Sequence, residues 1–349
     1  MNPAKLGAAA SALALAAAIP PAQAEPVAAK PVAVTVDNFA RAESDRYFAR
    51  SAQRGGVGKL VHVRVLMPID NQPVVRGNRD TLYSSGVFDL DAGPVTLVMP
   101  DAGSRYMSMS IYNEDHHVVG LHNGAGTYTV TREAAGTRYV LIGIRTLVDP
   151  ASPDDFRAAH ALQDAIRTSQ PGGPGSFIVP AWDKSSQDAL RTALITLGDT
   201  VPDSRRMFGA AGQVDPVRHL VGSAIAWGGL PEREAMYLIV KPERNDGKTA
   251  YRLDVGQVPV DGFWSISVYN ATGYYEPNAQ GAYTINSLTA KRGRDGNVSI
   301  RFGDCAADAA KAGNCLPIVP GWNYMVRFYL PHKEILDGTW TFPQALPLS

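Results

Sequence analysis

Hydrophobic and polar residues alternate most clearly in a strand-sized phrase that occurs twice in the chain. Residues 105–113 read RYMSMSIYN, and residues 262–270 read GFWSISVYN. Because side chains alternate across a β-strand, each copy predicts a strand with one large apolar face and one face rich in Ser and Tyr hydroxyls. Two such strands half a protein apart predict two β-domains of related plan. The apolar positions are Met107, Met109 and Ile111 in the first copy, and Trp264, Ile266 and Val268 in the second.

The rest of the pattern predicts a mainly β protein with a few connecting or buttressing helices. Strand-like segments bounded by turn sequences run from residue 61 to residue 145, and again from about residue 235 to the end. Helix starts are expected at Asp37, at Ser152, at Ser185 or Ser186, and at Asp215. The pattern predicts two β-sandwich domains. The expected division is a signal peptide at 1–24, a helix and first sandwich at 25–150, a helical connector at 151–234 and a second sandwich at 235–349.

The first 24 residues have the pattern of a secretory leader. Lys5 precedes an apolar run at residues 6–19, and Ala22-Gln23-Ala24 supplies small residues at a cleavage site. The run is shorter than the roughly 20 residues that a membrane span needs, so no membrane span is expected. We therefore expect a periplasmic or secreted protein.

Export changes the interpretation of the only two cysteines, Cys305 and Cys315. In an oxidising compartment they are expected to form a disulfide across a Gly- and Ala-rich loop. The alternative is two free thiols.

The composition of the 349-residue chain is that of a globular protein, and its formal net charge is zero with no basic stripe. Nucleic acid is therefore not an expected partner.

Several ordered motifs resemble a large bacterial family of exported proteins. This family pairs two modules known as domains of unknown function 1254 and 1214, and the resemblance covers nearly all of the mature chain. It implies an immunoglobulin-like sandwich followed by a jelly-roll-like one, and it implies no activity. The motifs that carry the resemblance include Val75–Ser84 (VRGNRDTLYS), Pro100-Asp101, Arg105-Tyr106, Gly262–Ser265, Arg327–Pro331 and Asp337–Trp340.

The densest polar cluster in the sequence is the segment from Arg76 to Tyr83. Arg76, Asn78 and Arg79 are candidates for binding an anionic group, since a guanidinium offers a bidentate fork to carboxylate or phosphate. Asp80 is a candidate base or orienting carboxylate, and Tyr83 a candidate donor. The alternative is structural, because an Arg–Asp pair with an Asn turn also fixes a β-corner.

A second candidate lies at Glu114-Asp115-His116-His117. His116 is the candidate proton carrier there, and Asn113 is expected to orient a substrate. A metal site is less favoured, because the spacing of these residues matches no strong zinc signature. The structural alternative is a solvated strand end. Arg327 stands inside an apolar and aromatic strand, so it is either a buried ion pair or a substrate anchor.

These candidates favour an exported enzyme that hydrolyses an ester or phosphoester of a small polar or anionic substrate. The sequence contains no serine-hydrolase elbow, zincin motif or nucleotide-binding loop, so those classes are disfavoured. The alternatives are a non-catalytic periplasmic module that binds carbohydrates or small ligands, and a structural envelope protein. The sequence does not specify a cofactor, and it leaves homo-oligomer formation open.

Overall fold

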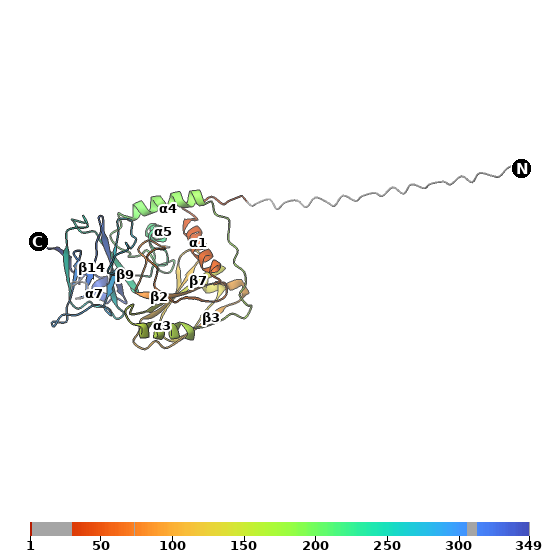
Figure 1. Cartoon of the computed structure of the whole chain (residues 1–349). Helices are drawn as coiled ribbons and strands as arrows, with labels where there is room; N and C mark the ends of the chain where they lie inside the picture. The colour runs from red at the N-terminus through yellow and green to blue at the C-terminus, as the bar shows by residue number, and fades with distance from the viewer. Residues whose placement is uncertain (2–29, 73, 306–312, 349) are drawn as a thin grey trace.

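The computed structural model describes residues 1, 30–72, 74–305 and 313–348. Apart from its first residue, the signal peptide predicted at 1–24 lies outside the described residues. Within the described residues the protein is mainly β, as predicted, with sixteen strands arranged in four sheets. In Figure 1 the second half of the chain forms a β-rich part beside the β-rich part made by the first half.

A five-stranded antiparallel sheet forms the centre of the first part. Its strand order is β1-β2-β7-β4-β5, and the first copy of the repeated phrase supplies β4. One face of this sheet packs on a three-stranded sheet of order β6-β3-β8 through the apolar side chains that the alternation predicted. The strands are β1 (Val61–Val63), β2 (Thr81–Asp89), β3 (Val95–Met99), β4 (Met107–Asn113), β5 (Val118–Asn123), β6 (Gly126–Val130), β7 (Tyr139–Leu147) and β8 (Arg167–Ser169).

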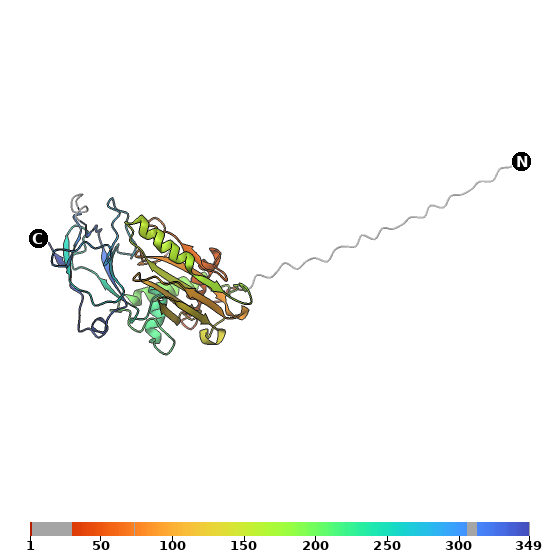
Figure 2. The same ribbon diagram turned by 90° about the horizontal axis from the view of Figure 1, so that it is seen from below.

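Helices cover both faces of the five-stranded sheet, as Figures 1 and 2 show. Helix α3 (Pro153–Ala165) lies on the same side as β3, where Ala159 packs on Leu82. Helix α1 (Phe39–Gln53) lies on the opposite side, and α4 (Lys184–Gly198) and α5 (Pro216–Ile225) pack on it. Residues 151–234, predicted as a connector, thus supply α3, β8, α4 and α5, all of which pack on the first part. A short helix, α2 (Arg132–Ala135), and a 3-10 turn, η1 (Leu90–Ala92), complete this part.

Two of the four predicted helix starts are confirmed and two are shifted. The Ser152 and Asp215 side chains cap α3 and α5 by accepting backbone N–H bonds. Helix α4 instead begins at Asp183, whose carboxylate accepts from the backbone N–H of Ser186. Ser186 was a predicted cap, but its hydroxyl donates to Asp183 and accepts from the Val34 N–H. At α1, Asn38 takes the cap position with no side-chain cap bond.

Two four-stranded sheets form the second part. The second copy of the repeated phrase supplies β11 in the sheet of order β12-β11-β15-β9, which packs on the sheet of order β14-β13-β10-β16. Met109 of β4 and Ile266 of β11 are both fully buried in their respective cores. The elements are β9 (Ala235–Val240), β10 (Tyr251–Val255), β11 (Trp264–Tyr269), β12 (Thr284–Asn286), β13 (Val298–Phe302), β14 (Cys315–Leu316), β15 (Asn323–Tyr329), α7 (Lys333–Leu336) and β16 (Leu346–Pro347).

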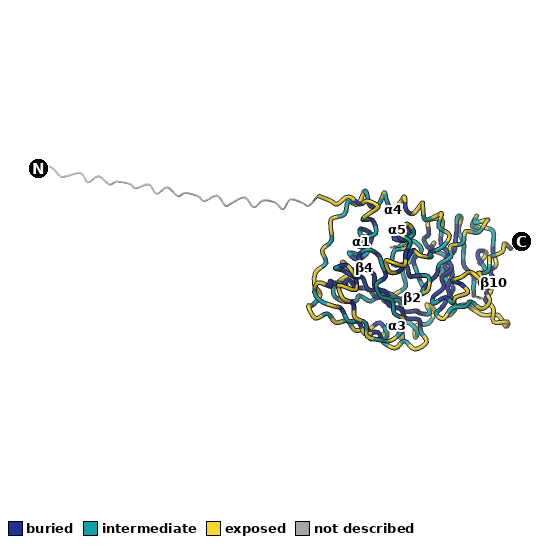
Figure 3. The backbone as a smooth tube through the Cα atoms, turned by 180° about the vertical axis from the view of Figure 1, so that it is seen from behind, coloured by how far each residue is buried: buried dark blue, intermediate teal, exposed yellow. Residues whose placement is uncertain are grey.

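The hydroxyl-rich face of β11 is buried against the first part of the chain. Ser265 and Ser267 are fully buried, and the Tyr269 hydroxyl donates to the carbonyl of Gly77 at 2.7 Å. Figure 3 shows the buried residues gathered in the centres of both parts, with exposed segments at the periphery. The polar face of the repeat therefore joins the two parts instead of facing solvent.

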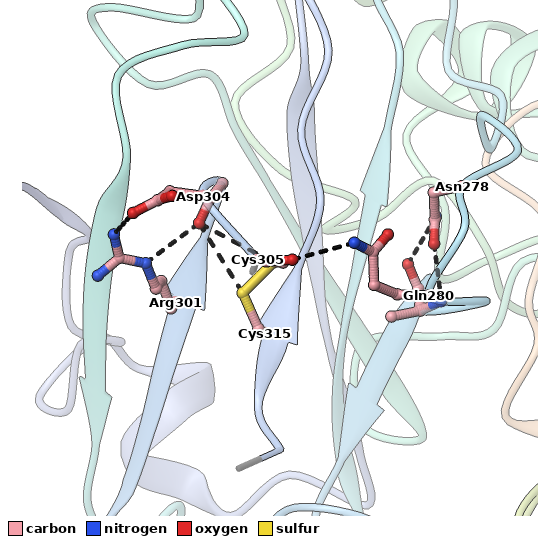
Figure 4. Close-up of a disulfide and its surroundings, with 8 residues drawn as sticks. Asn278, Gln280, Arg301, Asp304, Cys305 and Cys315 are labelled. Carbon is pink, nitrogen blue, oxygen red and sulfur yellow. Dashed lines mark hydrogen bonds and ion pairs between the residues drawn. A yellow bond between two sulfur atoms is a disulfide. The ribbon is translucent and has the colours of Figure 1, made fainter. Parts of the chain in front are cut away.

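The predicted disulfide between Cys305 and Cys315 is confirmed, with a Cα–Cα distance of 5.8 Å (Figure 4). It connects the end of β13 to β14, which lie side by side in a parallel pairing. The Cys305 carbonyl also accepts a hydrogen bond from Gln280 at 3.0 Å. The disulfide therefore fixes one edge of the outer sheet of the second part.

We expect removal of this disulfide to destabilise the second part measurably. Closing so short a loop constrains the unfolded chain by about 3 kcal/mol in the entropic description. The double variant Cys305→Ser/Cys315→Ser should therefore lose about 3 kcal/mol of unfolding free energy, measured by guanidinium denaturation. A reductant should lower the midpoint of the wild type and leave the double variant unchanged. Equal stability of oxidised and reduced wild type would contradict this prediction.

Candidate functional site

A cavity of about 350 Å³ lies where the first sheet, the second part and the helical layer meet. Strands β2 and β7 supply Tyr83 and Arg145 to its wall, and strands β9 and β15 supply Tyr237 and Arg327. A volume of this order is typical of small-molecule sites, which lie preferentially between domains. Most of the rest of the wall comes from α1, α4 and α5, the loop at residues 74–78 and the segments at residues 201–208 and 226–229.

Three residues in register across neighbouring strands of the first sheet form what we call the first Tyr–Arg–Ser row. Tyr83 of β2 is directly opposite Arg145 of β7, and Arg145 is directly opposite Ser108 of β4. The Arg145 guanidinium lies 5.6 Å from the centre of the Tyr83 ring. It donates to the Ser110 hydroxyl at 3.1 Å and to the Gly228 carbonyl at 2.8 Å. The arginine is thus fixed by its own sheet and by the segment that follows α5.

The second part repeats this arrangement as a second Tyr–Arg–Ser row of Tyr237, Arg327 and Ser265. Tyr237 of β9 is opposite Arg327 of β15, and Arg327 is opposite Ser265 of β11. Arg327 donates to the Ser267 hydroxyl at 2.8 Å and to the Gly77 carbonyl at 3.2 Å. The two sheets therefore present the same residue types at the same register.

The repeated phrase explains why the rows match. Ser110 and Ser267 occupy equivalent places in the two copies, and each accepts a bond from the arginine of its row. In each copy, the tyrosine two residues further on donates to the glycine carbonyl that also accepts from the arginine of the row. Tyr112 donates to the Gly228 carbonyl and Tyr269 to the Gly77 carbonyl, both at 2.7 Å. Each copy thus builds one arginine cradle from a serine, a tyrosine and a loop carbonyl.

The two copies also meet each other at the boundary between the parts. Tyr106 and Phe263 hold equivalent places in the phrase, and their ring centres lie 5.2 Å apart in an edge-on arrangement. Tyr329 stacks on Phe263 at 4.1 Å and contacts Tyr106 at 5.2 Å. Contact between equivalent positions is the geometry of an isologous interface. It brings β7 and β15, and hence Arg145 and Arg327, to one cavity.

The cavity wall carries a large excess of positive charge. Its five arginines face one carboxylate, Asp203, which is itself paired with Arg205 and with Arg218 at 2.7 Å. Two of the five, Arg46 and Arg191, share the buried carboxylate of Glu43. The other three, Arg76, Arg145 and Arg327, form no ion pair with any carboxylate of the described residues, and the Arg76 Nε is buried with no hydrogen-bond partner among them.

Tyrosine hydroxyls supply neutral donors beside these cations. Burial raises the pKa of Tyr237 to about 12, so its hydroxyl keeps its proton at neutral pH, and that hydroxyl makes no hydrogen bond within the described part of the chain. The Asn78 amide nitrogen lies within hydrogen-bond distance of three hydroxyls, those of Thr81 at 3.2 Å, Tyr83 at 3.2 Å and Tyr329 at 3.1 Å, and its two N–H groups serve two of them at a time. Its orientation is fixed because its side-chain oxygen accepts from the Asp80 N–H. Neither tyrosine hydroxyl donates to an acceptor among the described residues, so both O–H groups are free to donate to a ligand.

Four of the eight sequence-predicted site residues reach this cavity, and four do not. Arg76, Asn78, Tyr83 and Arg327 line it. Arg79, from the same segment as Arg76, instead donates to the Met67 carbonyl and lies over the ring of Tyr283 at 5.2 Å. Asn113 fixes a turn: its carbonyl oxygen accepts from the N–H groups of Asp115 and His117, and its amide donates to Ala135. The remaining two are the predicted proton carriers, Asp80 and His116.

Asp80 lies between the two parts and is fully buried outside the cavity wall. Its Oδ1 accepts from the Asn286 amide at 2.9 Å and from Thr284 at 3.3 Å, both on β12 of the second part. Its Oδ2 has no hydrogen-bond partner among the described residues. The geometry gives this carboxylate a joining role, because it accepts from β12 and does not line the cavity.

His116 is fully buried behind the cavity and holds its wall in place. Its Nε2 accepts from the Gly228 N–H at 2.9 Å, so its proton is on Nδ1, which donates to the Ser223 hydroxyl at 2.8 Å. Gly228 needs to be glycine because its φ is 79°. Burial lowers the pKa of His116 well below 6.5, and His219 and His117 lower it further. His116 is thus a neutral positioning residue for the carbonyl that binds Arg145.

Most residues of the wall were not predicted as site residues, among them Arg145, Tyr237, Tyr47 and Trp227. A signal existed for Arg145, since it is a charge inside an apolar strand as Arg327 is, but the pattern was interpreted only as a strand. No comparable signal marks Tyr47 and Trp227, whose rings stack at 4.3 Å although α1 and residue 227 are far apart in sequence.

Two family models match the chain and identify it. The model described as protein of unknown function DUF1254 matches residues 57–170, and that described as protein of unknown function DUF1214 matches residues 234–333. The chain belongs to the family that pairs these two domains, as its sequence motifs indicated. No curated protein matches the chain.

Two solved structures share the fold over most of their length. The VPA0106 protein from Vibrio parahaemolyticus is 15% identical with a TM-score of 0.68, and the match covers 90% of this chain and 98% of that one. An uncharacterized protein from Burkholderia cenocepacia is 12% identical with a TM-score of 0.51, covering 89% of this chain and 86% of that one. At these identities the likeness is one of fold alone.

Two further properties concern the described residues only. None of their helices has both the length and the hydrophobicity of a bilayer span. Nor do three or more of their His, Cys, Asp or Glu side chains gather in a group suited to a metal ion.

We expect replacement of His116 to change the pH dependence of stability. Because the folded-state pKa is depressed, the unfolded state binds more protons below pH 6.5, and stability falls as pH drops through this range. One such histidine changes the unfolding free energy by at most about 1.4 kcal/mol per pH unit. The unfolding free energy of His116→Gln should therefore fall less steeply than that of the wild type between pH 7 and pH 5, measured by urea denaturation. Parallel profiles would show that His116 is not held neutral.

Proposed function

We propose that the protein binds a small anionic molecule in the cavity between its two β-rich parts. One observation carries the proposal: Arg76, Arg145 and Arg327 line the cavity without any carboxylate partner among the described residues, beside tyrosine hydroxyls that are free to donate. Removing a cation from water is costly unless a counter-charge or hydrogen bonds replace the solvent. A bound carboxylate or phosphate supplies that counter-charge through the guanidinium fork.

Binding is favoured here over the ester or phosphoester hydrolysis that the sequence suggested. The two predicted proton carriers, Asp80 and His116, lie outside the cavity wall. The carboxylate in the wall, Asp203, is engaged by Arg205 and Arg218 and is poorly placed to act as a base. Hydrolysis stays a prediction, and the alternative of a small-ligand binding module becomes the leading interpretation.

The setting of this module is proposed from the sequence. The leader pattern at residues 1–24 supports export to the periplasm or beyond. The face-to-face packing of two sheets in each part supports two sandwiches, of which we propose the first is immunoglobulin-like and the second jelly-roll-like, as the family resemblance implies.

We expect the double variant Arg145→Gln/Arg327→Gln to weaken the binding of single anions, with inorganic phosphate and acetate as probes. Loss of a hydrogen bond to a charged group costs about 1.5–3 kcal/mol, or about 10- to 100-fold in affinity. Isothermal titration calorimetry measures the affinity, and a thermal shift proportional to ligand saturation checks it. A wild type that binds neither probe would contradict the proposal.

Two further variants separate binding from stability. Tyr237→Phe removes a hydroxyl that has no partner within the described residues, so it should weaken anion binding several-fold while leaving the melting temperature unchanged. Arg64→Gln is the matched control, because Arg64 contacts α3 through the His160 carbonyl at 3.0 Å, on the opposite face of the first sheet. It should bind as the wild type does, and equal weakening by Arg64→Gln and by the double variant Arg145→Gln/Arg327→Gln would indicate a non-specific effect.

A further inference from the structure

The two Tyr–Arg–Ser rows enter the same cavity from different parts of the chain. Each row contributes one arginine and one tyrosine to the wall, at matched registers of the two sheets. The cavity therefore presents two equivalent anion-binding groups and not one. A ligand that uses both must satisfy two cations held on separate scaffolds.

We propose that the ligand is an organic molecule with two acidic groups, one for Arg145 and one for Arg327, joined by an apolar spacer. The inference rests on the proposed function, since it requires that the cavity bind anions. The acidic groups are carboxylates or phosphates, which present the same oxygen pair to a guanidinium fork.

Separate hydrogen bonds keep the two arginines apart. Arg145 is bound to Ser110 and the Gly228 carbonyl, whereas Arg327 is bound to Ser267 and to the carbonyls of Arg76 and Gly77. The two guanidinium groups share no acceptor. Each guanidinium keeps its own set of contacts, which favours a separate acidic group for each.

The size of the cavity also favours an organic ligand over a single inorganic ion. Its volume of about 350 Å³ is more than ten times the share of one molecule in liquid water, which is about 30 Å³. An isolated phosphate or carboxylate would leave most of that volume to water. A molecule that reaches both rows occupies the space between them.

Part of the remaining wall has the chemistry of a spacer site. Stacked Tyr47 and Trp227 form one apolar surface, and Ile225, Ile239 and Met325 also line the cavity. These side chains offer no charge to a ligand, and they favour contact with a carbon chain or ring over contact with further polar groups.

The test compares anions of matched length with one and with two acidic groups. Calorimetric titrations of the purified protein would use the dicarboxylates from malonate to suberate, the monocarboxylates of the same lengths, and alkyl phosphonates and bisphosphonates as a second series. We expect one length of dianion to bind at least 10-fold more tightly than its monoanion, since a second charged hydrogen-bonded contact contributes about 10- to 100-fold. The series with the tighter optimum identifies carboxylate or phosphate as the natural group.

The arginine variants then show whether each acidic group has its own anchor. Arg145→Gln and Arg327→Gln should each reduce the best dianion to about the affinity of its monoanion, while each variant still binds monoanions. Monoanions that bind as tightly as dianions, or single variants that abolish monoanion binding, would overturn the two-anchor proposal and leave the anion site intact. Absence of binding by every anion would overturn the proposed function itself. If Arg327→Gln does not fold, the length series on the wild type and on Arg145→Gln still decides.

Discussion

Two guanidinium groups held inside sheets without a direct ion-pair partner are the constraint on which the junction of this protein depends. Arg145 and Arg327 each sit in the middle of a sheet, where an unsatisfied charge would destabilise the fold by several kcal/mol. Each is stabilised by a serine hydroxyl and by main-chain carbonyls, and neither forms an ion pair with an acid among the described residues. The Ser hydroxyls on the polar face of the repeated phrase accept hydrogen bonds from the two guanidinium groups. This explains why the Ser and Tyr positions are the same in both copies.

A second set of residues holds the acceptors in place. Asn78 orients the hydroxyls of Tyr83 and Tyr329. His116 accepts a hydrogen bond from the N–H of Gly228, whose carbonyl binds Arg145. Asp80 joins the start of β2 to β12 of the other part. Asp80 and His116 look catalytic in a sequence because they are titratable and stand in polar clusters. In the fold both lie outside the cavity wall, whereas Asn78 lines it.

The β architecture was predictable because alternation of apolar and polar residues is a local property of a strand. The repeated phrase placed Met109 and Ile266 correctly in two cores, and an exported chain with two cysteines predicted the disulfide. The site was predictable only in part. Arg76 and Arg79 are neighbours in sequence, yet the chain turns between them and only Arg76 faces the cavity. Tyr237 and Trp227 reach the wall through long-range packing, for which a single sequence contains no register information.

The use of backbone carbonyls as arginine acceptors limits how this site can change. The acceptor oxygens of Gly77 and Gly228 belong to the main chain, so no point mutation deletes them. A side chain at Gly228, whose φ is 79°, would act only by straining the backbone that positions the oxygen. Reshaping recognition by insertion or deletion in the two loops would disturb both the cradle and the joint between the parts. Redesign is therefore most accessible at the aromatic edge, where Tyr83 and Tyr237 can exchange a hydroxyl for hydrogen without moving the main chain.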